Sequence, residues 1–249
     1  MDNLSASLSM LANGALWSYI LRGIVFTLII SVMSVGFGVV FGSVLALVRN
    51  YCNQGFVCIF KWLSITYIEL FRNTPLLLWV FICLVFCPVP KIFTQKMLGL
   101  TSVEAQILFR SAVALIMFTS SIIAEVVRGG LNAVAEGQFE AGHSQGFNMV
   151  QIMWHIVLPQ AYRSIVPTLL SQIITTVKDS SYIANVAVIE LMSRTRKILS
   201  TSGVYNGTGQ QLVSDVFVLF GMAFLIYFII NFTLSYVVRY SQKGQESNA

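Results

Sequence analysis

The segment 23–48 most restricts what this chain can fold into, because it contains no charged residue over its whole length. At a rise of about 1.5 Å per residue, a helix over this segment can cross a hydrocarbon core of about 30 Å. The composition agrees, since 56% of the residues are hydrophobic and only 10% are charged. Such a composition is far from that of a soluble domain. We therefore expect a protein that is embedded in a membrane.

Four more apolar segments follow along the chain, and two of them are interrupted by charged residues. We predict one all-α membrane domain over residues 1–249 with about five transmembrane helices. Their predicted ranges are 23–48, 62–88, 106–127, 164–189 and 216–238. Gly38 and Gly42 in the first span form a small-x-x-x-small pair, which we interpret as a packing contact within the chain.

The charged residues and the cysteines exclude several kinds of site. The formal net charge is +5, and it is spread over loops without a basic block. That distribution argues against a nucleic-acid partner and favours a lipid surface. The cysteines form no Cys-x-x-Cys pair and lie in or beside apolar runs, where cysteine usually behaves as a small hydrophobic residue. We therefore expect no metal site at Cys52, Cys58, Cys83 or Cys87.

The segment 136–159 is the longest part of the chain that is neither an apolar span nor a tail. Its apolar residues recur at roughly helical spacing on both sides of Gly146. Glycine permits backbone conformations that other residues avoid, so a turn is expected there. The sequence therefore predicts two short amphipathic helices that form an exposed hairpin between two spans.

This hairpin resembles the cytoplasmic coupling loop of the permeases of ATP-binding-cassette (ABC) importers. The family pattern is Glu-Ala-Ala, three residues, Gly, nine residues, Ile, one residue and Leu-Pro. This chain matches the pattern at Glu140, Ala141, Gly146, Ile156, Leu158 and Pro159. Gly142 stands in place of the second alanine, which keeps the site small but lowers the local helix propensity. The resemblance implies that these seven residues couple the permease to an ATPase.

A second informative segment interrupts the predicted span 62–88. Glu69 and Arg72 lie one helical turn apart, and Pro75 must bend or break the helix. Ionisable residues inside a span are costly, so these two either line a pathway or form a buried pair with each other. The run around them also resembles the Tyr-x-Glu-x-x-Arg-Gly-Thr-Pro-Leu signature of the polar-amino-acid (histidine/glutamine permease-like) family of these permeases, with Asn73 in place of the glycine.

The predicted span 164–189 is also interrupted, by a lysine, an aspartate and two serines. A charged, hydroxyl-rich break inside a span is the pattern expected where a helix is distorted to bind a polar solute at membrane depth. The alternative is a charge pair that merely faces an aqueous gap. Opposite charges at both breaks could answer the ammonium and the carboxylate of an amino acid. The candidate solute-pathway residues are therefore Glu69, Arg72, Lys178, Asp179 and Ser180.

A third pair of charges lies at the end of the predicted span 106–127, where Glu125 and Arg128 are three residues apart. Residues with this spacing are neighbours on one helix face. We interpret them as a solvated pair with a structural role, which holds the coupling loop at a fixed angle.

The basic residues do not fix the orientation of the chain. The predicted topology places six lysine and arginine residues on one side and seven on the other. The positive-inside rule therefore gives no preference. The family resemblance implies an outside amino terminus, with the coupling loop and the carboxyl terminus in the cytoplasm.

The sequence contains no Gly-x-x-x-x-Gly-Lys-Ser/Thr segment, so the chain has no phosphate loop for ATP. The resemblance implies a type I ABC importer permease, not an enzyme, in the bacterial cytoplasmic (inner) membrane. It implies a separate ATPase subunit that binds ATP and magnesium, so no cofactor is expected in this chain. The other implied partners are a second permease chain, identical or paralogous, and an extracytoplasmic binding protein that delivers a polar amino acid.

Two other functions compete with this interpretation. An ion-coupled secondary transporter also uses broken helices, but five spans without an inverted repeat and a large hairpin argue against it. A membrane enzyme would need a cluster of histidine and carboxylate side chains, whereas His143 and His155 have only Glu140 close by in the sequence. ATP-driven, binding-protein-dependent import of a polar amino acid is the favoured function.

Overall fold

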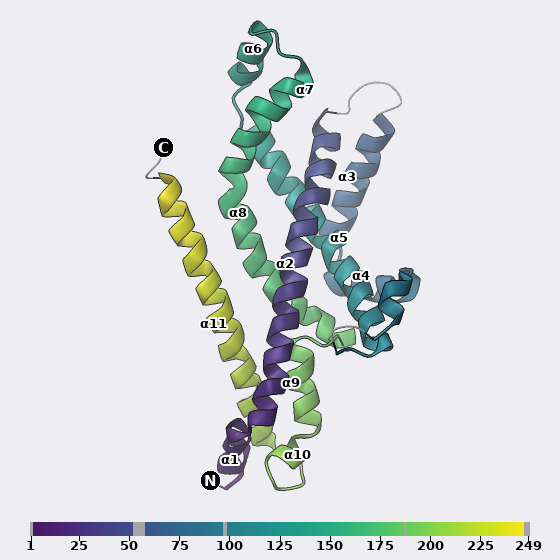
Figure 1. Cartoon of the computed structure of the whole chain (residues 1–249), viewed down its shortest axis with the longest axis vertical. Helices are drawn as coiled ribbons and strands as arrows, with labels where there is room; N and C mark the ends of the chain where they lie inside the picture. Colours follow the sequence, from purple (N-terminus) through teal and green to yellow (C-terminus); the bar gives the residue numbers. More distant parts are fainter. Residues whose placement is uncertain (1, 52–57, 97–98, 187, 247–249) are drawn as a thin grey trace.

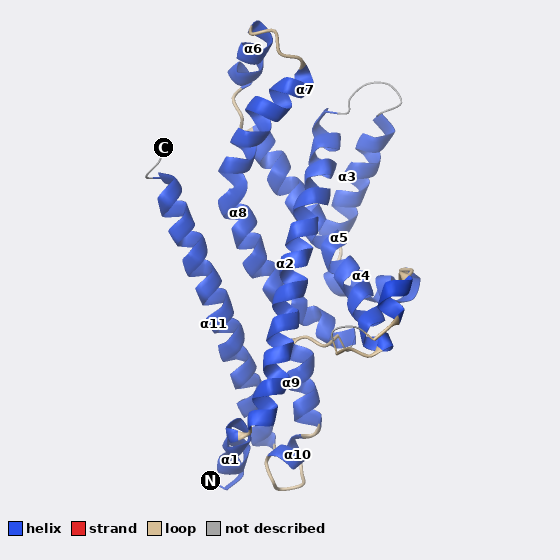
Figure 2. Ribbon diagram, in the orientation of Figure 1, coloured by secondary structure: helices blue, strands red, loops and turns tan. Residues whose placement is uncertain are grey.

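The computed structural model describes residues 2–51, 58–96, 99–186 and 188–246. Within these ranges the regular secondary structure is helical (Figure 2). The molecule is elongated, with two short helices at one end and the amino terminus at the other (Figure 1). Cys52 and the side chain of Cys58 lie outside the described residues.

Helix α2 (Gly14–Tyr51) is the axis around which the other helices are arranged (Figure 1). It begins before the predicted span 23–48, because the residues ahead of that span continue the same helix. Gly38 and Gly42 lie against α5, where a Cβ atom on Gly42 would be 2.8 Å from the carbonyl oxygen of Ser120. The predicted packing of this glycine pair within the chain is confirmed.

The predicted span 62–88 is wrong as a single helix. Helices α3 (Cys58–Arg72) and α4 (Leu76–Phe86) are separate, and they are bent by 113° at the break. Pro75 causes the break, because it has no backbone N–H and disfavours a helical conformation in the residue before it. Together the two helices have the length and apolar composition of one broken span.

The next long helix leads into the predicted hairpin. Helix α5 (Ser102–Asn132) covers the predicted span 106–127 and begins with a capping box between Thr101 and Glu104. It is followed by α6 (Glu136–Ser144), α7 (Met149–Ile152), a π-helical turn (Met153–Val157) and α8 (Leu158–Asp179). The predicted pair of short helices on either side of Gly146 is confirmed. We call residues 136–157 the coupling hairpin.

The predicted span 164–189 is not one α-helix either, because α8 ends at Asp179 and a 3-10 helix (Ser180–Val186) follows. Helix α11 (Val213–Glu246) contains the predicted span 216–238. The shorter elements are α1 (Asp2–Ser9), η1 (Met10–Ala12), η3 (Lys91–Thr94), α9 (Leu191–Ser200) and α10 (Ser202–Tyr205).

The number of membrane spans follows only in part from these helices. Three helices, α2, α5 and α11, are long and apolar enough to cross a membrane, and the bent α3–α4 pair makes a fourth if it is counted as one span. Helix α8 is not among them, although it packs against all three long helices. Five spans and a single domain over residues 1–249 therefore stay predictions.

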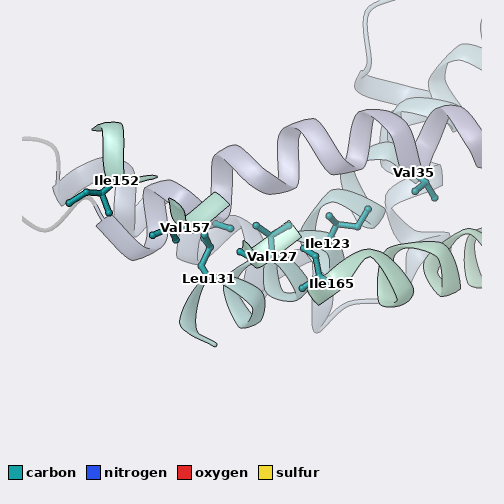
Figure 3. Packing of buried hydrophobic residues seen from close by; sticks show 9 residues of the cluster. Val35, Ile123, Val127, Leu131, Ile152, Val157 and Ile165 are labelled. Atoms are coloured by element: carbon teal, nitrogen blue, oxygen red, sulfur yellow. The ribbon is translucent and has the colours of Figure 1, made fainter. Parts of the chain in front are cut away.

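One buried apolar cluster joins the coupling hairpin to the long helices (Figure 3). Ile152 and Val157 come from the hairpin, Leu131 from α5 and Ile165 from α8, and all four are less than 10% exposed. Because side chains from these elements share one core, the hairpin is packed onto the bundle and does not hang from flexible linkers.

Candidate functional site

The residues of the coupling motif divide into an exposed and a packed set. Glu140, Ala141, Gly146 and Pro159 are exposed on the hairpin, which projects from one end of the bundle (Figure 1). The remaining three are buried or half-buried, and these are Gly142, Ile156 and Leu158. The exposed set is free to contact another molecule, and the packed set holds the shape of the hairpin.

Gly142 fits its position better than the alanine of the family pattern would. A Cβ atom on Gly142 would lie 2.8 Å from Cγ1 of Ile152 and 3.2 Å from Cδ1 of Ile156. An alanine would therefore need these isoleucine side chains to move. Since Ile156 belongs to the motif, its contact with the Gly142 position gives a physical reason for their fixed spacing.

Gly146 forms the turn between the two hairpin helices. Its φ angle is +81°, a left-handed conformation that side chains other than glycine and asparagine rarely adopt. A Cβ atom on Gly146 would meet no described atom within 4 Å. Within this chain, the need for glycine is therefore conformational and does not come from a close approach. Asn148 and Gln151 then begin α7 with a capping box.

A cluster of ion pairs lies where α2, α3 and α5 meet, at the last turn of α2. Glu125 is its centre, and its carboxylate accepts a hydrogen bond from Nη1 of Arg49 at 2.6 Å. Arg128 donates to the same carboxylate from Nε at 3.0 Å and from Nη2 at 2.9 Å. Nη1 of Arg72 lies 3.6 Å from it. With Glu69, these residues form what we call the Glu125 cluster.

The predicted pairing of Glu69 with Arg72 is wrong. Oε1 of Glu69 lies 3.4 Å from Nη2 of Arg49, and Arg72 turns to Glu125. The sequence hid this arrangement, because Arg49 stands at the end of an apolar span and looked like an ordinary loop residue. The pairing of Glu125 with Arg128 is confirmed, and it ties three helices together beside the coupling hairpin.

The second set of candidate solute residues lies at the far end of α8. Lys178 is exposed, Asp179 is half-buried, and Ser180 is buried with its hydroxyl donating to the carbonyl of Val177 at 2.8 Å. Among the described residues, no hydrogen bond or ion pair joins this set to Glu69 or Arg72. The chain therefore presents two separate polar regions. In the same described ranges, no group of three or more His, Cys, Asp or Glu side chains is placed to hold a metal ion.

Helix α8 carries a polar face that the sequence analysis did not single out. Ser164, Thr168, Ser171, Thr175 and Lys178 recur at intervals of three or four residues, and all except the half-buried Thr175 are exposed. Residues with this spacing share one side of a helix. Two of the hydroxyls donate to carbonyls of their own helix, at 2.8 Å for Ser164 and 3.0 Å for Ser171. Their oxygen lone pairs still face outward.

A buried carboxylate at the other end of the bundle was also missed. Glu190 has no exposed surface, and it caps α9 by accepting from the backbone N–H groups of Met192 at 2.9 Å and Ser193 at 2.6 Å. The hydroxyl of Tyr227 on α11 also donates to it, at 3.0 Å. A glutamate directly before a helix is a capping signal, but its burial between three helices depends on tertiary packing.

Comparison with known proteins shows what chains this arrangement is similar to. The model of the family "Binding-protein-dependent transport system inner membrane component" matches residues 38–246. The probable glutamine ABC transporter permease protein GlnM of Bacillus subtilis (strain 168) is 33% identical over 93% of this chain and 95% of its own length. The glutamate/aspartate import permease protein GltK of Escherichia coli O157:H7 is 32% identical over 90% of this chain and 92% of its own length.

Solved structures show the same fold at lower sequence identity. A crystal structure of an amino acid ABC transporter with histidines covers 91% of this chain and 94% of its own, with a TM-score of 0.68 and 23% identity. An inward-facing structure of the MetNI methionine ABC transporter covers 91% of this chain and 98% of its own, with a TM-score of 0.63 and 21% identity. The helical arrangement described above is therefore that of transporter permease chains.

Proposed function

This chain belongs to the family of binding-protein-dependent transport system inner membrane components, and on that premise we propose that it is the permease subunit of an ATP-driven importer of polar amino acids. It is thus a multi-pass protein of the inner membrane. The proposed assembly contains two permease chains, identical or paralogous, two ATPase subunits that bind ATP and magnesium, and an extracytoplasmic binding protein. The names of the relatives, which include glutamine and glutamate/aspartate permeases, support an amino acid as the solute.

The observation that carries this proposal is the way the coupling hairpin is built. Its exposed residues, including Glu140 and Gly146, stand at one end of the molecule, and its buried residues share a core with α5 and α8 (Figure 3). A force applied to the exposed surface therefore reaches both helices through close-packed side chains. We assign the exposed set as the contact with the ATPase. The packed set, Gly142, Ile156 and Leu158, transmits the movement.

The polar face of α8 supports a route for the solute. Helix α8 lies among three helices that are apolar enough to span a membrane. A polar helix face is costly in lipid, so at membrane depth it faces protein or water. We propose that this face, with Lys178, Asp179 and Ser180 at its far end, lines the route, and that Glu69 and Arg72 form a second polar region along it. The charged groups answer the ammonium and the carboxylate of the solute.

Uptake of a panel of labelled amino acids by the reconstituted complex tests this function. The complex with its ATPase is placed in lipid vesicles with ATP inside and binding protein outside. We expect ATP-dependent uptake of polar amino acids only. The Asp179→Asn and Glu69→Gln variants should raise the half-saturating amino acid concentration or change the preference, while binding-protein-stimulated ATP hydrolysis is retained in part.

Three results would contradict parts of this proposal. Uptake that needs no ATPase and follows an ion gradient would instead identify an ion-coupled secondary transporter. Loss of assembly with the ATPase in both variants, with unchanged selectivity in the remaining complex, would make these two side chains structural. Apolar solutes carried as well as polar ones would exclude the proposed polar route.

A further inference from the structure

The end of the molecule opposite the coupling hairpin carries an exposed basic surface. Its residues come from three parts of the chain, namely α2, the η3 segment and α9. All of their side chains are exposed, and we call them the basic outer face: Arg22, Lys91, Lys96, Arg196 and Lys197. Helix α9 lies at this end of the bundle, far from α6 and α7 (Figure 1).

The carboxylates of the same end do not neutralise this surface. Glu190 and Asp215 are fully buried, and Glu104 is held in the capping box with Thr101. Asp179 adjoins Lys178 in the sequence, so that pair adds no net charge. Among the described side chains at this end, the exposed charges are therefore positive. The coupling hairpin differs, since the segment 136–159 contains two glutamates and no lysine or arginine.

Helix α9 presents its bases from a rigid support. Its inner side buries Leu191 and Ile198, and the guanidinium of Arg194 lies 4.2 Å from the ring centre of Tyr19 and donates to the Tyr19 carbonyl at 3.0 Å. A Cβ atom on Gly23 would lie 3.0 Å from the Cα atom of Leu191, so α9 and α2 are in close contact. The exposed bases therefore project from a fixed helix.

Membrane insertion does not account for these charges. Lysine and arginine in short loops favour the cytoplasmic side, so a basic outer end opposes the orientation that the proposed function requires. Charges that work against insertion need another role on the outer side. Exposed charges at a docking surface speed the encounter with a partner of opposite sign and suppress wrong partners.

We propose that the basic outer face is the surface on which an acidic face of the extracytoplasmic binding protein docks. This inference rests on the proposed function, in which a binding protein must reach the outer side of the permease. The family description supplies the class of partner, and the uncompensated positive charge supplies its sign. Anionic lipid headgroups share that sign, and the experiment below separates them from the binding protein.

The test reverses two charges on α9 in the reconstituted complex, with the double substitution Arg196→Glu and Lys197→Glu. The measured quantity is the binding protein concentration that gives half-maximal stimulation of ATP hydrolysis. At about 50 mM salt we expect this concentration to rise about tenfold, and at about 300 mM salt we expect the difference to shrink, because salt screens exposed charges. A maximal stimulated rate close to that of the unmodified complex shows that the variant is assembled.

Arg239→Glu is the matched control, because Arg239 is an exposed base near the carboxyl end of α11, away from the basic outer face. It should leave the half-maximal concentration unchanged. An identical value for the double variant and the unmodified complex at both salt concentrations would overturn the docking proposal. So would a shift that occurs in anionic vesicles and disappears in phosphatidylcholine vesicles. If the unmodified complex shows no stimulation by any binding protein, the proposed function itself fails.

Discussion

The two ends of the chain are held together by different chemistry. At the hairpin end, the carboxylate of Glu125 is paired with arginines, and the side chains of Arg72 and Arg128 are 41% and 33% exposed. At the opposite end, Glu190 and Asp215 have no exposed surface, and the donors within hydrogen-bond distance of them are neutral. One end therefore relies on ion pairs near water, and the other on buried acceptors with fixed donors.

Asp215 shows how complete the second arrangement is. Its Oδ1 accepts from the hydroxyl of Ser7 at 2.6 Å, and its Oδ2 accepts from Nδ2 of Asn206 and from the backbone N–H of Leu212, both at 2.9 Å. These contacts join α1, the loop after α10 and the first turn of α11. A single carboxylate thus fixes three segments that are far apart in the sequence.

The difference teaches which end can rearrange. Ion pairs accessible to water are worth about 0–1 kcal/mol each, and they can change partners at little cost. Removing the acceptor from buried donors leaves those donors unsatisfied, which costs about 1–3 kcal/mol for each group. We therefore expect the hairpin end to be remodelled during transport, while the outer end stays rigid.

The largest expected effect on stability comes from Glu190. The Glu190→Leu variant leaves the N–H groups of Met192 and Ser193 and the hydroxyl of Tyr227 without their acceptor. We expect a loss on the order of 3 kcal/mol in unfolding free energy, measured as a lower Tm of the purified complex. Glu190→Gln keeps one acceptor oxygen and should lose less. A Leu variant as stable as the unmodified chain would break the comparison at its rigid end.

Gly146 should give the next largest effect, on coupling and not on stability. Because its φ angle is +81°, Gly146→Trp strains the turn by about 1–3 kcal/mol and places a bulky ring on the surface assigned to the ATPase. Uptake per ATP hydrolysed should fall about tenfold or more, corresponding to about 1.4 kcal/mol, while the chain still enters the membrane. Gly146→Asn is the matched control, since asparagine tolerates this conformation. Normal uptake by the Trp variant would remove the hairpin from the coupling step.

The smallest stability effect is expected at Glu125. Glu125→Gln weakens its pairing with Arg49, Arg72 and Arg128, but two of these arginines keep access to water. The loss in unfolding free energy should be on the order of 1 kcal/mol or less, as measured by the same thermal unfolding. The ratio of uptake to ATP hydrolysis should change more than the Tm does. If this variant destabilises the complex as much as Glu190→Leu, the proposed contrast between the ends is wrong.

The sequence predicted the local features and missed those that depend on distant segments. The helix pair around Gly146 and the contact of Gly38 and Gly42 follow from spacing and residue size. The pairing of Glu69 was missed because Arg49, which is remote in sequence, competes better for it than Arg72 does. Glu190 looked like a loop residue, since three helices that bury it are brought together only in the folded chain.

The continuation of α8 was overestimated for a similar reason. Apolar residues on both sides of Lys178 and Asp179 have the length of one span, and composition cannot tell a continuous helix from one that changes to a 3-10 turn at Ser180. In the same way, the polar face of α8 is visible only when residues 164–178 are placed on a helix and their exposure is known. The coupling residues were easier, because their motif is contiguous.

The π-helical turn between α7 and α8 changes how this part of the chain has to be drawn. A π turn holds about one residue more than an α-helical turn, and each residue turns a helix by about 100°. A helical wheel drawn through residues 149–179 without a break would therefore rotate α7 by about that angle relative to α8. It would place Ile152 on the wrong side, although this side chain is fully buried. Any alignment or graft that moves the hairpin onto another permease must keep the number of residues in Met153–Val157, because the phase of the hairpin is set there.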